Sequence, residues 1–214
     1  HFIKLDQWYW SILKNYLPRD KSAKCIDVPC GYGNFLYFLR NRGYKNIVGY
    51  DLDEDQIALA KLLNLPARHE DIFDALRSNN EPIDLISSFD FIEHITKDDA
   101  LSFIELCFEK LNTGGVLVLR TPSADGPFGG HDANNDLTHE WTMTSTVLRT
   151  LLEMNGFRSI NIIDEHPRPI GLIGVCRWLV YFPTKLLASL LCICLGMRPP
   201  KIWSRSMIAV SYKQ

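Results

Sequence analysis

The chain has 214 residues, of which 46% are hydrophobic and 22% charged, and its formal net charge is −2. This length suffices for one well-packed domain and not for two of full size, so we expect a single domain over residues 1–214. The composition excludes a disordered or fibrous chain, and the slight negative charge excludes a nucleic-acid partner bound through neutralised phosphates.

The cysteines have neither zinc-ribbon nor disulfide-framework spacing, so we expect reduced, mostly buried thiols in a cytoplasmic protein. No secretory signal pattern opens the sequence, although His1 stands where an initiator methionine would, so the sequence could be a fragment. The six cysteines are Cys25, Cys30, Cys107, Cys176, Cys192 and Cys194.

Residues 1–20 predict an N-terminal amphipathic helix, at about 5–16, before a regular alternation begins. From about 23 to 163, apolar runs of strand length alternate with helical patterns, which is typical of repeated βα units around a parallel sheet. We therefore predict a doubly wound α/β fold. The expected strands are 24–28, 46–51, 67–70, 83–89, 115–121, 158–164 and 207–212. The expected helices are 34–42, 54–63, 72–78, 97–111 and 144–154, with Gly43, Asn64 and Gly156 at C-caps.

The first predicted strand runs directly into a glycine loop, Asp27-Val28-Pro29-Cys30-Gly31-Tyr32-Gly33. A strand that ends in such a turn brings backbone N–H groups and a helix N-terminus to one point. Because Gly31 and Gly33 lack a Cβ that would block a ligand, the loop predicts a site for a nucleotide-like cofactor.

Acidic residues end the next two predicted strands. Asp51 follows Asp27 by 24 residues, where a carboxylate can accept hydrogen bonds from ribose hydroxyls. A helix cap is the alternative role for such an aspartate, although Asp53 or Asp55 could supply the cap instead. Asp71 and Ile72 offer an acidic and an apolar side chain that could bind and flank an adenine ring.

These motifs together resemble the class I S-adenosylmethionine-dependent methyltransferases over most of the chain. The family's loop reads D-x-G-x-G-x-G, and Pro29 replaces its first glycine here. Residues 87–94 are similar to the segment after strand four in ubiquinone-type O-methyltransferases, and 114–122 to the fifth strand of that subgroup. The resemblance implies a Rossmann-like, seven-stranded, mostly parallel sheet whose last strand is antiparallel, with S-adenosyl-L-methionine as cofactor. The cofactor-binding residues that it implies are Asp27, Pro29, Cys30, Gly31, Tyr32, Gly33, Asp51, Leu52, Asp71, Ile72 and Phe89.

A nicotinamide-dependent dehydrogenase is the competing enzyme class, because it also needs a glycine loop and a ribose carboxylate. Its G-x-G-x-x-G pattern is absent, since Gly31-Tyr32-Gly33 continues into Asn34-Phe35-Leu36. The missing third glycine, which allows close helix packing in dehydrogenases, favours the methyltransferase interpretation.

Methyl transfer to a hydroxyl requires a base, because an aliphatic alcohol does not ionise near neutral pH. Histidine suits this task, and two histidines follow predicted strand ends. His94 follows the fourth strand, and His139 ends a segment resembling the D-x-T-H stretch of sugar and quinone O-methyltransferases. We expect His139 or His94 to take the acceptor proton, with Glu93 or Asp136 orienting the imidazole.

The same region also offers ligands for a divalent cation. His131 and Asp132, with Asp136 and His139, could bind such an ion, together with Glu93 and His94. We do not favour metal dependence, because polar loops are common and these residues show no fixed helical ligand spacing.

Two segments depart from the alternation. The polar, glycine-rich segment 122–142 follows the fifth strand, where insertions line the ligand crevice, so we expect an acceptor-side loop. The segment 167–203 is an apolar helical insertion whose core, 170–197, is interrupted by Arg177, Pro183 and Lys185. A buried helical pair is the leading interpretation, a membrane-surface segment the second, and a spanning helix the third.

The insertion suggests the acceptor, because apolar, Trp- and Arg-bearing surface beside the active edge suits an acceptor attached to a lipid. The C-terminal segment 201–210 is similar to the ends of methyltransferases found among bacterial surface-polysaccharide enzymes. We therefore expect a sugar hydroxyl of a glycan or lipopolysaccharide-type acceptor, with a quinone or other small molecule as runner-up. A non-catalytic, cofactor-binding interaction module is the alternative from another class.

Overall fold

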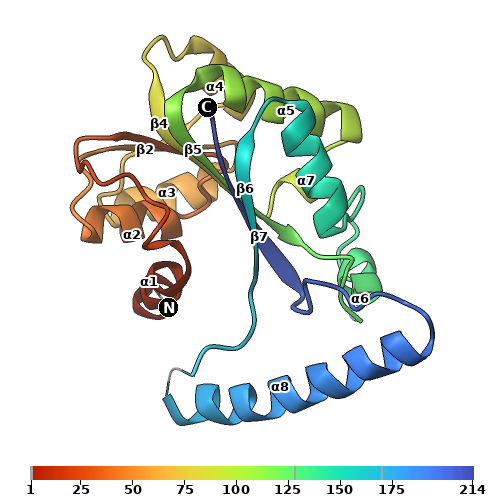
Figure 1. Cartoon of the computed structure of the whole chain (residues 1–214). Coiled ribbons are helices and arrows are strands. Elements are labelled where there is room, and N and C mark those ends of the chain that lie inside the picture. The colour runs from red at the N-terminus through yellow and green to blue at the C-terminus, as the bar shows by residue number, and fades with distance from the viewer. Residues whose placement is uncertain (1, 128, 170) are drawn as a thin grey trace.

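The computed structural model describes residues 2–127, 129–169 and 171–214, and one seven-stranded sheet runs through it (Figure 1). The strand order is β3-β2-β1-β4-β5-β7-β6. Strands β1 to β5 are parallel to one another, and β7 is antiparallel to both β5 and β6. The predicted fold class, with its antiparallel last strand, is therefore confirmed. The strands are β1 (Lys24–Asp27), β2 (Asn46–Asp51), β3 (Ala67–His69), β4 (Ile83–Phe89), β5 (Leu111–Pro122), β6 (Arg158–Asp164) and β7 (Ser206–Tyr212).

Helices cover both faces of the sheet, and each helix predicted outside the apolar insertion is present with small shifts at its ends. The acceptor-side segment 122–142 also holds a short helix that the sequence did not predict. The helices are α1 (Phe2–Leu13), α2 (Asn34–Asn41), α3 (Glu54–Leu62), α4 (Ile72–Ser78), α5 (Lys97–Lys110), α6 (Gly129–Asn134), α7 (Ser145–Met154) and α8 (Gly171–Cys194), with a 3₁₀ turn η1 (Ile92–His94).

Local chemistry sets the helix boundaries. Asp53 and Thr96 cap α3 and α5, because their side-chain oxygens accept hydrogen bonds from backbone N–H groups of the first turn. The predicted C-cap residues Gly43, Asn64 and Gly156 all have positive φ. These caps begin and end the helices sharply, so the connections between helices and strands are short. The carboxyl ends of the strands and the N-termini of the following helices therefore meet at one edge of the sheet.

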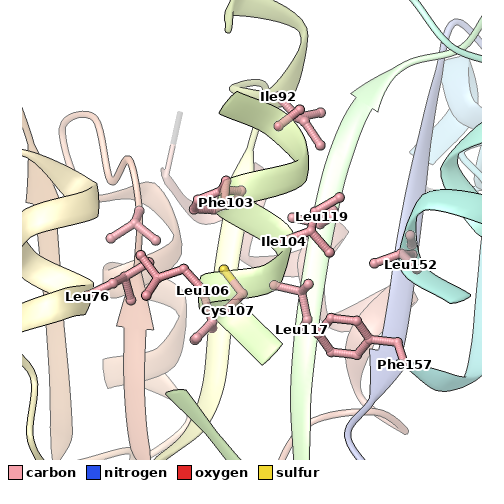
Figure 2. Close-up of a cluster of buried hydrophobic side chains, with 14 of the residues drawn as sticks. Leu76, Ile92, Phe103, Ile104, Leu106, Cys107, Leu117, Leu119, Leu152 and Phe157 are labelled. Carbon is pink, nitrogen blue, oxygen red and sulfur yellow. The ribbon is translucent and has the colours of Figure 1, made fainter. Parts of the chain in front are cut away.

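Alternate residues of each central strand face opposite layers. Ile26 and Leu117 belong to a cluster with α4, α5 and α7, of which Figure 2 shows Phe103, Ile104 and Phe157. Their neighbours along the strands, such as Cys25 and Val118, pack instead against α1 and α2. This period of two gives the sheet a core on each face and fixes its register.

The insertion differs from the leading interpretation. It forms one 24-residue helix, α8, rather than a buried pair, and all of its residues are described and none is buried. Figure 1 shows α8 lying outside the layered body, joined to it by a connection at each end. Its length and composition would allow it to cross a membrane. Cys176, Cys192 and Cys194 lie on it unburied, so the expectation of mostly buried thiols holds for the other three cysteines.

The prediction of a buried helical pair was wrong because it equated apolar composition with burial. Arg177, Pro183 and Lys185 do not interrupt the helix, and Pro183 lies inside it on the exposed side. A proline removes one backbone donor, and in an exposed helix the carbonyl it leaves unpaired can reach solvent. The apolar surface of α8 therefore needs an explanation other than packing within the described chain.

Candidate cofactor and acceptor site

The loop between β1 and α2 has the geometry of a ligand cradle. Gly31 and Gly33 have φ values of 51° and 87°, which L side chains rarely adopt. Gly33 is the N-cap of α2, and a Cβ there would lie 2.5 Å from Cδ1 of Leu65. The peptide bond before Pro29 is cis. The turn therefore needs glycine at both positions, and it aims the N-terminus of α2 at the sheet edge.

Asp51, at the end of β2, reaches back to this loop. Its Oδ2 accepts a hydrogen bond of 2.7 Å from the Gly31 N–H, and its Oδ1 accepts one of 2.9 Å from Asp53. Asp53 itself caps α3, so it takes the role that the sequence left open between Asp53 and Asp55. Gly49 allows the close approach, because a Cβ there would lie 2.5 Å from Cβ of Cys30. Asp51 and the glycine loop thus form one unit.

Asp27 lies deeper than a ligand contact requires. It is 2% exposed, and Ser87 on β4 donates a hydrogen bond of 2.6 Å to its Oδ1. Burial raises the pKa of Asp27 to about 8, because a charged carboxylate is poorly solvated there. Through the hydrogen bond from Ser87, Asp27 ties β1 to β4 beneath the loop.

The remaining cofactor candidates lie in different environments. Oδ1 of Asp71 caps α4, at 2.9 Å from the Phe73 nitrogen, while Ile72 is only 4% exposed and packs into the core. Phe89 joins an aromatic cluster, with its ring 4.9 Å from that of Phe35. Leu52 is 60% exposed. Of these candidates, Leu52 is exposed, whereas Asp71 and Phe89 are half-buried.

Helix α1 adds aromatic residues that the sequence did not predict for this site. Tyr9 packs 5.2 Å from Phe89, and Phe2 lies edge-on to Tyr32 at 5.7 Å. Burial, and then the nearby Asp27, raise the pKa of the Tyr9 hydroxyl. These contacts are long-range, and the amphipathic pattern of α1 carried no signal for them.

A second cluster forms where η1 meets the acceptor-side loop. Nδ1 of His94 lies 2.8 Å from Oγ1 of Thr138 and 3.3 Å from the carbonyl oxygen of Thr138. Thr138 donates its hydroxyl hydrogen to Asp136 at 2.7 Å, so both Thr138 oxygens act as acceptors toward His94. Nδ1 therefore carries the proton, and Nε2 of His94 keeps its lone pair in the neutral ring.

Glu93 and His139 complete this cluster. The ligand atoms of Glu93, His94 and His139 lie within 4.8 Å of one another, and the two imidazole ring centroids are 4.8 Å apart. Glu93 is 1% exposed and accepts a hydrogen bond of 3.1 Å from Thr121. Burial raises the pKa of Glu93 to about 7. The structure thus brings together the three candidates, with Asp136 joined to them through Thr138.

The cluster is also the set that could hold a divalent cation, since one carboxylate and two imidazoles are suitable ligands. It differs from the larger set expected from the sequence. Within the described residues, His131 and Asp136 are not part of it, and the side chain of Asp132 lies outside the description.

Thr138 and Thr121 were missed by sequence reasoning. Each bonds a candidate catalytic side chain, Thr138 to His94 and Thr121 to Glu93. The Thr of the D-x-T-H segment was a usable signal for the first, whereas Thr121 at the end of β5 had none.

The sheet order and the glycine cradle with Asp51 at the carboxyl strand ends are typical of Rossmann-like proteins that bind a nucleoside cofactor. Residues 6–162 match the family model described as a methyltransferase domain. The chain therefore belongs to this methyltransferase family, as its sequence motifs suggested.

Relatives and solved structures agree with this family. A probable S-adenosylmethionine-dependent methyltransferase of Mycolicibacterium smegmatis is 29% identical over 62% of this chain and 51% of its own length. A ubiquinone biosynthesis O-methyltransferase of Psychrobacter cryohalolentis is 28% identical over 46% of this chain and 40% of its own length. The chain thus spans about half or less of these relatives. The crystal structure of a SAM-dependent methyltransferase from Archaeoglobus fulgidus has the same fold, with a TM-score of 0.71 at 18% identity, over 97% of this chain and 94% of that one.

Proposed function

We propose that this chain is an S-adenosylmethionine-dependent O-methyltransferase, acting as one domain over residues 1–214, whose acceptor is a sugar hydroxyl of a glycan or lipopolysaccharide-type molecule. The observation that carries the proposal is the pairing of two clusters at one sheet edge. One is the glycine cradle with Asp51, and the other is the set Glu93, His94 and His139.

The cofactor occupies the cradle in this proposal. Asp51 has a carboxylate at the right place to exchange its bond to Gly31 for bonds to ribose hydroxyls. Asp71 and Ile72 flank the adenine, and Phe89 borders the methyl-bearing end. The backbone of the loop from Asp27 to Gly33 follows the amino-acid part of the cofactor.

The reaction is an in-line displacement. The acceptor oxygen forms a bond to the methyl carbon while the carbon–sulfur bond breaks, and the sulfur keeps that electron pair. The enzyme contributes alignment and removes the hydroxyl proton. Nε2 of His94 has the lone pair for this step, and the chain from Asp136 through Thr138 holds its ring. His139 is the second candidate base, and the buried Glu93 orients the pair.

A quinol or another small phenol is the runner-up acceptor. The relative named as a ubiquinone biosynthesis O-methyltransferase supports this choice. The two acceptors differ in their need for a base, because a phenol ionises near pH 10 and an aliphatic hydroxyl far above it. Loss of the base should therefore affect a sugar acceptor more strongly than a phenol.

We further propose that the protein works in the cytoplasm at the inner face of a membrane, held there by α8. The outward face of α8 is apolar, with Leu172, Leu186 and Leu190 at least 50% exposed. Its two charged residues, Arg177 and Lys185, lie instead beside a cavity toward the body. A helix with this division suits the interface of a lipid bilayer.

Methyl transfer from isotopically labelled cofactor tests the proposed acceptor. We expect label to enter a lipid-linked or soluble glycan and to enter a catechol quinol analogue more slowly. Label in the quinol alone would replace the sugar by the runner-up. Cofactor binding without transfer to either class would contradict O-methyl transfer.

A further inference from the structure

A cavity of about 550 Å³ lies between α8 and the body of the protein. Its volume is within the range of about 300 to 1,000 Å³ that is typical of small-molecule sites. On the α8 side its wall includes Val180, Tyr181 and Ala188, and on the body side Pro127 and Trp203. An apolar space of this size suits a hydrocarbon chain rather than a polar ligand.

The cavity is built and not a loose gap. Asp164, at the end of β6, accepts hydrogen bonds from the Tyr181 hydroxyl and from Lys185 on α8, at 3.1 and 3.2 Å. The same carboxylate accepts hydrogen bonds from the backbone N–H groups of Trp203 and Ser204. Burial alone would raise the pKa of Asp164, but the bonds from Ser204 and Lys185 outweigh it and lower the pKa. The Asp164 carboxylate therefore holds both walls of the cavity in place, α8 on one side and the segment at Trp203 on the other.

Two cations lie at this apolar space. Lys185 is engaged by Asp164, whereas Arg177 has no hydrogen-bond or ion-pair partner among the residues that the structure describes. A guanidinium beside an apolar cavity is suited to bind a phosphate at the end of an inserted chain.

The sheet topology places the cavity at the same edge of the sheet as the proposed catalytic residues. Strands β5 and β6 run in the same direction, because both are antiparallel to β7. Asp164 therefore ends β6 at the edge where β5 ends and the acceptor-side loop begins. A Cβ at Gly126 of this loop would lie 3.0 Å from the carbonyl oxygen of Trp203, so the loop and the cavity wall are in contact.

We propose that this cavity binds the apolar chain of an amphiphilic acceptor, with Arg177 holding its phosphate. The inference rests on the proposed methyl transfer at the neighbouring histidines. The chain anchors the acceptor, and the phosphate fixes how far the head group extends toward the cofactor. The bilayer at α8 supplies such a molecule directly.

Calorimetric titration of the 214-residue chain with dodecyl phosphate, below its micelle concentration, tests the proposal. We expect binding that Ala188→Trp weakens at least tenfold by filling the cavity. Leu186→Trp, which adds the same ring on the exposed side of α8, should change the affinity less than twofold. Farnesyl phosphate in place of dodecyl phosphate distinguishes a branched isoprenoid chain from a straight acyl chain.

The cation is tested separately. Arg177→Gln should weaken the binding of dodecyl phosphate about tenfold and leave that of dodecanol unchanged. Arg198, an exposed arginine after α8, does not line the cavity, so Arg198→Gln should alter neither. Absence of binding by both phosphates, or equal losses in the Ala188 and Leu186 variants, would overturn the cavity proposal. S-adenosylmethionine binding and methyl transfer to a water-soluble acceptor are measured on the same variants. Failure of transfer in the unmodified protein would instead reject the proposed function.

Discussion

The cofactor edge and α8 are built in opposite ways. At the edge, the Asp51 carboxylate accepts a hydrogen bond from the Gly31 N–H, and the close contacts at Gly33 and Gly49 leave no room for another side chain. Helix α8 has no buried residue and is joined to the body at Asp164. The difference shows that one part carries its function in internal geometry, whereas the other presents surface to something outside the chain.

The largest effect should come from the histidines at the edge. His94→Ala should lower kcat by about 10²- to 10⁴-fold, the usual contribution of a general base, with S-adenosylmethionine affinity unchanged. His139→Ala separates the two candidates, and His131→Ala, in the same loop, serves as the control. Steady-state kinetics with labelled cofactor measures the effect. Unchanged kcat in both His94→Ala and His139→Ala would remove the proposed base.

The second prediction compares how a core substitution and a substitution on the exposed side of α8 change the stability of the fold. Phe103→Ala should lower the free energy of unfolding by about 3 to 5 kcal/mol, because the ring is fully buried. Leu186→Asp should change it by less than about 0.5 kcal/mol, since Leu186 is 62% exposed. Chemical denaturation gives both values.

The Leu186→Asp variant also tests whether α8 binds membranes. Leu186→Asp should lower co-sedimentation with anionic lipid vesicles at least tenfold, because it places a charge on the apolar face of α8. An unmodified protein that stays wholly in the supernatant would contradict the membrane role of α8.

The remaining comparison concerns the pH dependence of stability. The pKa of Asp27 is raised from 3.8 to about 8, so the native state keeps a proton that the unfolded chain loses. Its stabilising effect is complete below pH 3.8 and is lost as pH rises toward 8. The pKa of Asp164 is lowered, so its contribution is present above pH 3.8 and is lost as pH falls below that value.

Asparagine variants test these opposite dependences of stability on pH. Asp27→Asn should remove the loss of stability between about pH 4 and 8, and Asp164→Asn should remove a loss at acidic pH. Denaturation curves collected from pH 3 to 9 measure both. Parallel pH profiles for the unmodified protein and Asp27→Asn would show that Asp27 is ionised in the native state.

Local sequence chemistry predicted the cofactor edge well. Glycines that need positive φ, and caps such as Asp53, are determined by a few neighbouring residues, so Gly31, Gly33 and the strand ends were found where expected. In the link from Asp136 to His94, the hydrogen bond between Thr138 and His94 joins residues 44 apart, and only folding could show it. Composition alone could not decide whether the apolar residues of α8 face a core or the surroundings.

Calorimetric titration with S-adenosylmethionine tests the central claim, that the glycine cradle and Asp51 form the cofactor site. The account predicts one binding site per chain. It also predicts at least a tenfold loss of affinity in Asp51→Ala, with Asp55→Ala, an exposed aspartate of α3, as the unaffected control. No binding to the unmodified protein, or equal affinity in the Asp51→Ala variant, would contradict the account.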